Sequence, residues 1–463
     1  MLQVLHSVSL LLLANLIFAQ AKVKTWDTRD FGAVGDAKTL NTIAIQNAID
    51  SCAKAGGGKV VLEEGIYLSG TILLKQGVTL FLEENATLLG SPNPDDYQNI
   101  DPFVDATGQQ RGKCLIGALE VENVAIEGAG KIDGQGKAFE RANLLQTMKR
   151  LGKDTAQINA YASNRPFLLR FVRSSGISLK NIHIRQSAAW ACHFYQCQNI
   201  LVDSISIYNH AHRNNDGIDL DSSSDAIVKN CTIDAGDDAI CFKTTSPIPT
   251  QNIQVSGCKL KSDWGAIKFG TESMGDFKNI SITDCHLHDT KGGGIKILSV
   301  DGANISNLTI DRIKMDNVDM PIFIRLGERL RTYRNAPKQV VGSMDSIQIS
   351  NVQASSRSLE NSRVQPPSGI LITGTAKHKI GYLSLKNISL QLAGGGKTEH
   401  RNKVVAEDER RYPEFSLFEI LPASILYARH VKALKINNLS FDFFEKDERS
   451  EMLYSDVEQV EIQ

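Results

Sequence analysis

Three carboxylates in the middle of the chain have the types and spacing for acid–base chemistry. Asp216 lies in the segment NNDGIDLD, and Asp237 and Asp238 lie in GDDAICFK. Each segment continues into a short run of alternating apolar residues, and the two runs begin 22 residues apart, at Ile218 and Ile240. That spacing is close to one turn of a stacked solenoid, which would gather the three acids on one face. Clustered carboxylates are what hydrolysis of a glycosidic bond requires.

Basic residues recur at matching places in the following runs. We treat five isoleucines as equivalent, with steps of 22, 27, 28 and 27 residues: Ile218, Ile240, Ile267, Ile295 and Ile322. Lys268 and Lys296 come one residue after this position and are expected to be neighbours on the surface. Like charges about 5 Å apart are unfavourable unless an anion lies between them. Either lysine alone would be an ordinary surface charge. Lys268 and Lys296 together with Asn214, Lys243 and Arg325 predict a binding site for an acidic polysaccharide.

A repeated pattern must position these residues. From about residue 120, an Asn or Ser is followed by alternating branched apolar residues, a polar turn and another apolar run, as in GISLKNIHI and NISITDCHL. No copy could bury a core alone, so the copies must stack. β-Branched residues dominate and no amphipathic helix recurs, which argues against a helical array. The sequence predicts an all-β fold, a right-handed single-stranded parallel β-helix that occupies residues 22–463 as one domain.

Several segments depart from this pattern. A helix expected over Asn41–Ala55 would cap the open end of the solenoid, as terminal repeats require. Three excursions, near 138–165, 326–343 and 391–415, are expected to be inserted loops or helices. The seven Asn-x-Ser/Thr sequons mostly fall at turn-to-strand positions, where Asn tolerates tight turns, and we interpret them as structural.

Eight cysteines in an exported protein would ordinarily suggest disulfides. Cys231, Cys258 and Cys285 recur every 27 residues. This spacing favours a stacked ladder of small apolar side chains over three cysteines that each form a disulfide bond with another partner. Cys192 and Cys197 are close enough in the sequence to pair. No Cys–His set has zinc-ligand spacing, and we expect no metal and no cofactor.

The first 21 residues predict the compartment. They contain an apolar core of about a dozen residues and end in Ala-Gln-Ala, which is typical of a cleaved secretory signal peptide, although no Lys or Arg precedes the core. We therefore expect a secreted or periplasmic protein that is soluble and monomeric. The formal net charge of −1 gives no basic excess for nucleic acid or a membrane surface.

The order of NNDGID, GDDAI and KFGTE on successive repeats, with the opening DFGAVGD and the later MPIFIRLG, resembles glycoside hydrolase family 28, the polygalacturonase-like pectinases. The resemblance implies that Asp237 is the general acid, and that Asp216 and Asp238 activate the water. It also implies inversion of the anomeric centre, which needs acid and base carboxylates roughly 6.5–9.5 Å apart. The chain departs from the family at two motifs: Trp264 replaces the His of Gly-His-Gly, and Gly294 replaces the Arg of Arg-Ile-Lys.

The sequence thus predicts a pectin-degrading glycoside hydrolase of the polygalacturonase type that acts on galacturonosyl linkages. Attack from a chain end is expected, because the excursions could close one end of the groove. The two departures leave a rhamnogalacturonan-type hydrolase as an alternative. A catalytically weak polysaccharide-binding β-helix, such as an adhesin, is a rival that the intact acids argue against. A pectate lyase would need a calcium-binding acidic cluster and an arginine base, and Arg213 alone lies next to the acids in the sequence.

Overall fold

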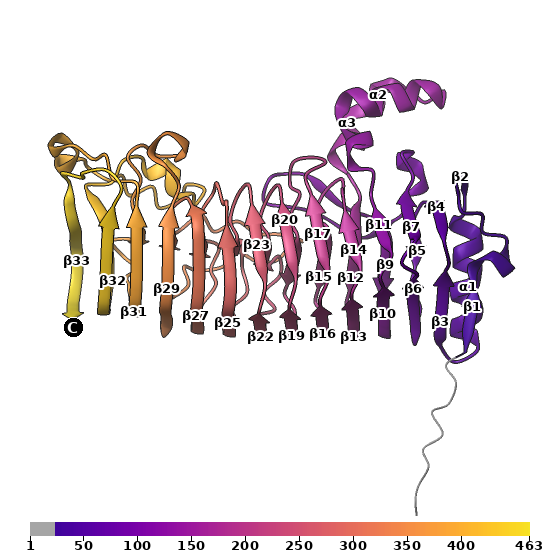
Figure 1. Ribbon diagram of the computed structural model, residues 1–463, viewed down its shortest axis with the longest axis horizontal. Helices are drawn as coiled ribbons and strands as arrows, with labels where there is room; N and C mark the ends of the chain where they lie inside the picture. Colours follow the sequence, from indigo (N-terminus) through magenta and orange to yellow (C-terminus); the bar gives the residue numbers. More distant parts are fainter. Residues whose placement is uncertain (1–23) are drawn as a thin grey trace, which may run out of the picture.

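The structure is a computed structural model that describes residues 24–463, in which the chain winds into a long coil of parallel strands (Figure 1). The signal peptide predicted for residues 1–21 lies outside the described residues. One ladder of paired strands, which we call the site ladder, runs along the coil through β5 (Ile72–Leu73), β9 (Gln110–Leu119), β12 (Phe167–Val172), β15 (Cys192–Tyr195), β18 (Ile218–Asp221), β21 (Ile240–Thr244), β24 (Ile267–Ser273), β26 (Ile295–Ser299), β28 (Ile322–Leu326), β30 (Ile370–Thr373), β32 (Ala423–Phe443) and β33 (Ser450–Ile462).

Two further ladders complete the cross-section. The second runs from β1 (Thr25–Asp27) through β3 (Gly58–Leu62), β6 (Val78–Leu82), β10 (Glu122–Gly128), β13 (Ser175–Lys180), β16 (Gln198–Asp203), β19 (Ser224–Lys229) and β22 (Thr250–Ser256). The third runs through β2 (Asp36–Leu40), β4 (Gly65–Ser69), β7 (Ala86–Gly90), β11 (Lys131–Asp133), β14 (His183–Arg185), β17 (Ser206–Asn209), β20 (Thr232–Ala235) and β23 (Lys259–Ser262). Both continue into long strands: β25 (Phe277–His288), β27 (Ile305–Val318), β29 (Ile347–Ser356) and β31 (Ile380–Leu392). This arrangement confirms the predicted parallel β-helix.

The register of the site ladder is the one that the sequence predicts. Ile218 pairs with Ile240, Ile240 with Ile267, Ile267 with Ile295, and Ile295 with Ile322. Two residues after Ile240 and Ile267, the side chains of Phe242 and Phe269 point into the core. Their rings stack with centroids 4.5 Å apart. Because side chains alternate along a strand, the residue between these two inward positions faces away from the core.

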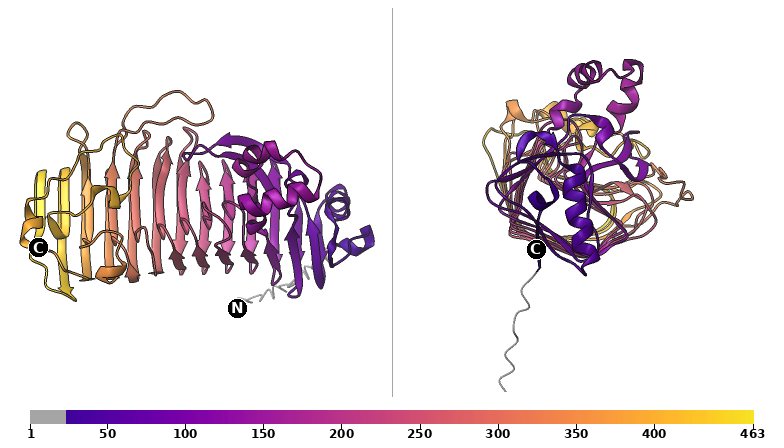
Figure 2. Two further views of the ribbon diagram at one scale, coloured as in Figure 1. Left: turned by 90° about the horizontal axis from the view of Figure 1, so that it is seen from above. Right: turned by 90° about the vertical axis from the view of Figure 1, so that its right-hand side faces the viewer.

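One helix closes an end of the coil, and two others project from its side. The amphipathic helix α1 (Thr42–Lys54) agrees with the predicted cap to within one residue at each end, and it buries Ile45, Ala48, Ile49 and Cys52. It lies across the end of the coil in the end-on view of Figure 2. The excursion near 138–165 forms α2 (Arg141–Arg150) and α3 (Ile158–Ser163), which project from the coil (Figure 1).

Asparagines of the predicted sequons have structural roles in the turns. Asn279 adopts a left-handed φ of 56°, and its side-chain amide donates to Asn252 Oδ1 at 3.1 Å. Asn307 in turn donates to Asn279 Oδ1 at 3.2 Å, so the side chains form a hydrogen-bonded ladder along the coil. All eight cysteines are free and buried, and Cys258 contacts both Cys231 and Cys285 in the predicted stack. Within residues 24–463, no helix has the length and apolar character to cross a membrane.

Candidate active site

The turns that lead into β18 and β21 gather the three predicted acids. Asp216 lies two residues before β18, and Asp238 lies two residues before β21 in the next turn of the coil, with Asp237 beside it in the sequence. The two turns are stacked, because the backbone N–H of Gly217 donates to the carbonyl of Asp238 at 2.9 Å. One carboxylate oxygen from each acid lies within 4.8 Å of the others. The predicted clustering is therefore confirmed.

Burial gives the acids unequal surroundings. Burial, and then the charge of the adjacent Asp238, raises the pKa of Asp237 to about 6. Burial and the neighbouring Asp219 raise the pKa of Asp216 well above its ordinary value. Asp238 instead accepts a hydrogen bond from the ammonium group of Lys268, whose Nζ lies 2.6 Å from Asp238 Oδ2. Neighbouring carboxyls in such different environments can serve as acid and base in one site.

The separation expected for inversion, roughly 6.5–9.5 Å between the acid and base carboxyl groups, stays a prediction. The nearest single oxygens of the three acids lie within 4.8 Å of one another. The reason is local: Asp237 and Asp238 are sequence neighbours, and Asp216 is only one strand spacing away, about 4.8 Å.

The lysines next to the acids are buried rather than exposed. Lys268 and Lys296 pair in register on β24 and β26 as predicted. Their predicted surface position is wrong, because Lys268 is 4% exposed and Lys296 is 0% exposed. Each ammonium group meets an internal carboxylate: Lys268 meets Asp238, and Lys296 meets Glu414 at 2.6 Å. These internal carboxylates compensate the two neighbouring positive charges.

Lys243 connects the acids to a second carboxylate group. Its Nζ lies 3.4 Å from Asp216 Oδ2, 3.4 Å from Asp219 Oδ1 and 3.5 Å from Glu272 Oε2. It also lies 4.5 Å from the ring centroid of Trp190.

The oxygens of Asp216, Asp237 and Asp238 lie close enough together that they could also hold a cation. Lys243 and Lys268, however, already place ammonium groups against two members of the cluster, which favours an acid–base interpretation.

A small roofed cavity of about 40 Å³ lies over the acids. Its lining includes all three acids and three of the predicted binding residues, together with side chains that the sequence did not single out: Asn214, Asp216, Asp237, Asp238, Lys243, Lys268, Asp105, Thr107, Trp190, Thr271, Glu272 and Tyr412. Lys296 does not line it. Arg325 does not line it either, because it donates to Thr373 Oγ1 at 2.9 Å and to the carbonyl of Glu407 at 2.7 Å.

The roof comes from three segments that are far apart in the sequence. Residues 105–109 join β8 (Asn99–Val104) to β9, and the N–H of Ala106 donates to Glu272 Oε1 at 3.1 Å. Arg331, in the excursion near 326–343, donates to the carbonyl of Ala106. Tyr412, in the excursion near 391–415, hydrogen-bonds through its hydroxyl with Thr271 Oγ1 at 3.0 Å. The site is therefore a covered cavity rather than an open groove.

Two buried arginines near the acids were missed by the sequence analysis. The side-chain oxygen of Asn214 accepts hydrogen bonds from Arg111 at 3.2 Å and from Arg165 at 3.0 Å. Arg111 is also paired with Asp105 at 2.7 Å. Asn214, predicted to bind substrate, is thus held by two cations. No repeat position marked these arginines, since Arg111 lies beside the β8–β9 turn and Arg165 follows the helical insertion.

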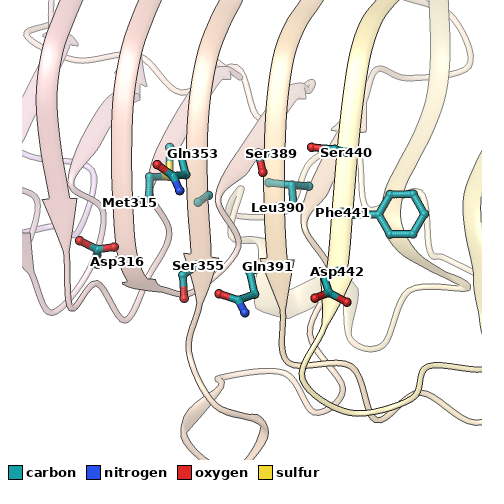
Figure 3. A pocket seen from close by; sticks show the side chains of 11 residues that line it. Met315, Asp316, Gln353, Ser355, Ser389, Leu390, Gln391, Ser440, Phe441 and Asp442 are labelled. Atoms are coloured by element: carbon teal, nitrogen blue, oxygen red, sulfur yellow. The ribbon is translucent and has the colours of Figure 1, made fainter.

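A larger hollow lies elsewhere on the coil and lacks this chemistry. Its volume is about 410 Å³, and it lies across β27, β29, β31 and β32, with amide, hydroxyl, apolar and carboxylate side chains in view (Figure 3). Its two carboxylates, Asp316 and Asp442, belong to β27 and β32 and are separated by β29 and β31. Three strand spacings, about 14 Å, are too many for an acid–base pair. The smaller cavity is therefore the candidate site.

Known proteins resemble the chain along most of its length. The model of the family "Glycosyl hydrolases family 28" matches residues 59–408. A probable polygalacturonase of Vitis vinifera is 27% identical over 286 residues, which cover 57% of this chain and 55% of that protein. An exo-poly-alpha-D-galacturonosidase of Dickeya chrysanthemi is 27% identical over 290 residues, which cover 54% of this chain and 48% of that protein. The chain thus spans about half the length of these relatives.

A solved structure shares the fold over nearly the whole chain. The family 28 exopolygalacturonase of Yersinia enterocolitica superposes with a TM-score of 0.68 at 21% sequence identity. The superposition covers 96% of this chain and 79% of that one.

Proposed function

Because the chain belongs to glycosyl hydrolases family 28, we propose that it hydrolyses galacturonosyl linkages of pectin, releasing units from a chain end. The observation that carries this proposal is the cluster of Asp216, Asp237 and Asp238 in one cavity, in which Asp216 and Asp238 are buried and Asp237 is partly exposed. Relatives named polygalacturonase and exo-poly-alpha-D-galacturonosidase support the same bond type.

The unequal carboxyls suggest how the bond is broken. Asp237, whose pKa is raised to about 6, keeps its proton in mildly acidic solution and donates it to the glycosidic oxygen as that oxygen leaves. Asp238, with Asp216 beside it, accepts a proton from a water that attacks the anomeric carbon.

The roof supports attack at a chain end. A cavity of about 40 Å³ is far smaller than the sites of a few hundred Å³ that hold drug-sized ligands, which favours a chain end over a polymer laid across the site. A polymer cannot lie across a covered site without displacing all three segments at once. A terminal sugar needs only a local opening.

The test compares two polymers side by side. We expect homogalacturonan to yield single sugars or short units with a slow loss of viscosity. A rapid viscosity drop with few new reducing ends would contradict chain-end attack. A rhamnogalacturonan-type hydrolase is the second candidate, favoured by Trp264 and Gly294 at the two altered motifs. Release of product from rhamnogalacturonan alone would select it.

The site of action is part of the proposal. We propose that residues 1–21 direct export and that the mature protein acts as a secreted or periplasmic monomer on acidic pectic polysaccharide. N-terminal sequencing of the exported protein should then begin at Lys22. A mature protein that retains its first 21 residues would contradict this.

A further inference from the structure

An internal carboxylate neutralises the lysine that lies beside the candidate acids. The sequence predicts that an anion must lie near the adjacent Lys268 and Lys296, and a bound acidic sugar would be one source of it. The structure provides that anion from within the chain: Glu414 Oε2 lies 2.6 Å from Lys296 Nζ. Both partners are buried, with Lys296 0% and Glu414 3% exposed.

The ion pair lies against the reacting groups. A Cβ atom placed on Gly265 would meet Asp238 Oδ1 and Lys296 Cδ, each at 3.0 Å, so the Lys296 side chain runs next to Asp238. The Lys296 ammonium group also lies 5.3 Å from the ring centroid of Trp264. The pair therefore lies next to Asp238 but behind the lining of the cavity, and a sugar carboxylate could approach Lys296 only from this side.

Glu414 is held firmly in this position. It belongs to residues 393–422, which we call the strap and which also place Tyr412 over the cavity. Directly after Glu414, the aromatic rings of Phe415 and Phe418 pack on Phe323 of β28, with centroids 6.5 and 6.0 Å away. These contacts anchor the strap to the site ladder and hold the backbone of Glu414 next to Lys296.

We propose that Glu414 determines specificity by occupying the place that a uronate carboxylate would take beside Lys296, so that this subsite takes an uncharged pyranose. This inference rests on the proposed function and narrows its substrate. A uronate could reach Lys296 only by displacing Glu414 and leaving a buried carboxylate unpaired, which is strongly unfavourable. An uncharged ring leaves the pair intact. It could come from rhamnose in rhamnogalacturonan or from a methyl-esterified galacturonosyl residue.

The test compares ligands that differ in charge. Binding of trigalacturonate, its methyl ester and a rhamnogalacturonan tetrasaccharide is measured by titration calorimetry on the full chain, and initial rates are measured in parallel. Wild type should bind an uncharged-ring ligand at least about tenfold more tightly than trigalacturonate. Glu414→Gln should remove most of that preference. Tighter binding of the ester or of the tetrasaccharide identifies the source of the uncharged ring.

A matched control separates charge from position. Glu409→Gln makes the same change on the same strap, at a side chain with no ion-pair partner among the described residues, and should leave the preference unchanged. Wild type that prefers trigalacturonate, a preference unaltered by Glu414→Gln, or no binding of any ligand would overturn the proposal. If Glu414→Gln does not fold, the wild-type preference decides alone. A preference in binding without any hydrolysis would instead reject the proposed function.

Discussion

Asp237 and Asp238 are adjacent in the chain, yet their carboxyl groups have different partners. Lys268 is paired with Asp238, whereas burial keeps the pKa of Asp237 at about 6. This difference at the scale of single residues assigns the proposed roles of acid and base, and it can be tested one side chain at a time.

Asp237→Asn should lower turnover by at least about a hundredfold, the usual scale for loss of a general acid. The amide keeps the shape of the side chain but cannot protonate a leaving oxygen. Initial rates on an oligogalacturonide measure the loss, with thermal unfolding as a check on the fold. Near-normal turnover in a folded variant would reject Asp237 as the acid.

The rate should depend on pH in a direction set by Asp237. Because the acid acts in its protonated form and burial raises its pKa to about 6, kcat/KM should fall as the pH rises through about 6. A pH–rate profile of wild type measures this. A rate that stays constant or increases between pH 5 and pH 8 would mean that another group supplies the proton.

Asp219 should make stability depend on pH. Burial raises its pKa to about 8 in the folded protein, against about 3.9 in an unfolded chain. The folded state therefore binds a proton that the unfolded state has lost, and this stabilisation is present at low pH and disappears as the pH rises through about 8. Asp219→Asn is uncharged at every pH, so its Tm should decline less than that of wild type between pH 5 and pH 9.

Asp221 provides a matched control for that measurement. Although burial opposes it, the hydrogen bond with His193 brings the pKa of Asp221 to about 2. Asp221→Asn should lower the Tm without flattening its decline between pH 5 and pH 9. Equal slopes for wild type and Asp219→Asn would show that Asp219 is ionised in the folded protein.

At the scale of elements, three roof segments cover the site ladder. Tyr412→Ala should open the roof over Thr271 and shift cleavage toward internal bonds. The viscosity of homogalacturonan should then fall several-fold faster per bond broken than with wild type. Tyr382→Ala, on β31 and 39% exposed, is the control and should leave the product pattern unchanged. An unchanged pattern with Tyr412→Ala would mean that the strap does not restrict access.

The elements also show what a single sequence can predict. The register of Ile218, Ile240 and Ile267 could be predicted because strand alternation recurs and the steps between repeats differ by only a few residues. The burial of Lys296 could not, since its partner Glu414 lies 118 residues away in an excursion without periodicity. Arg111 and Arg165 were missed for the same reason. Repeats place the acids, whereas insertions decide which charges remain available to a ligand.

At the scale of the whole molecule, a long coil brings the acids together and its loops close over them. The coil supplies a rigid base on which stacked turns fix the carboxyl groups. The loops reduce an exposed sheet face to a cavity of about 40 Å³. The same architecture serves unrelated functions, so the proposed activity depends on the site and not on the fold.

The central claim is that this cluster hydrolyses a terminal glycosidic bond by direct attack of water. Proton NMR of wild type mixed with trigalacturonate tests it most directly, because the first product formed reveals both the bond broken and its stereochemistry. Free sugar or a short unit should appear first as the inverted anomer. First appearance of the retained anomer would mean that a carboxylate forms a covalent intermediate, and an unsaturated product would mean elimination instead of hydrolysis.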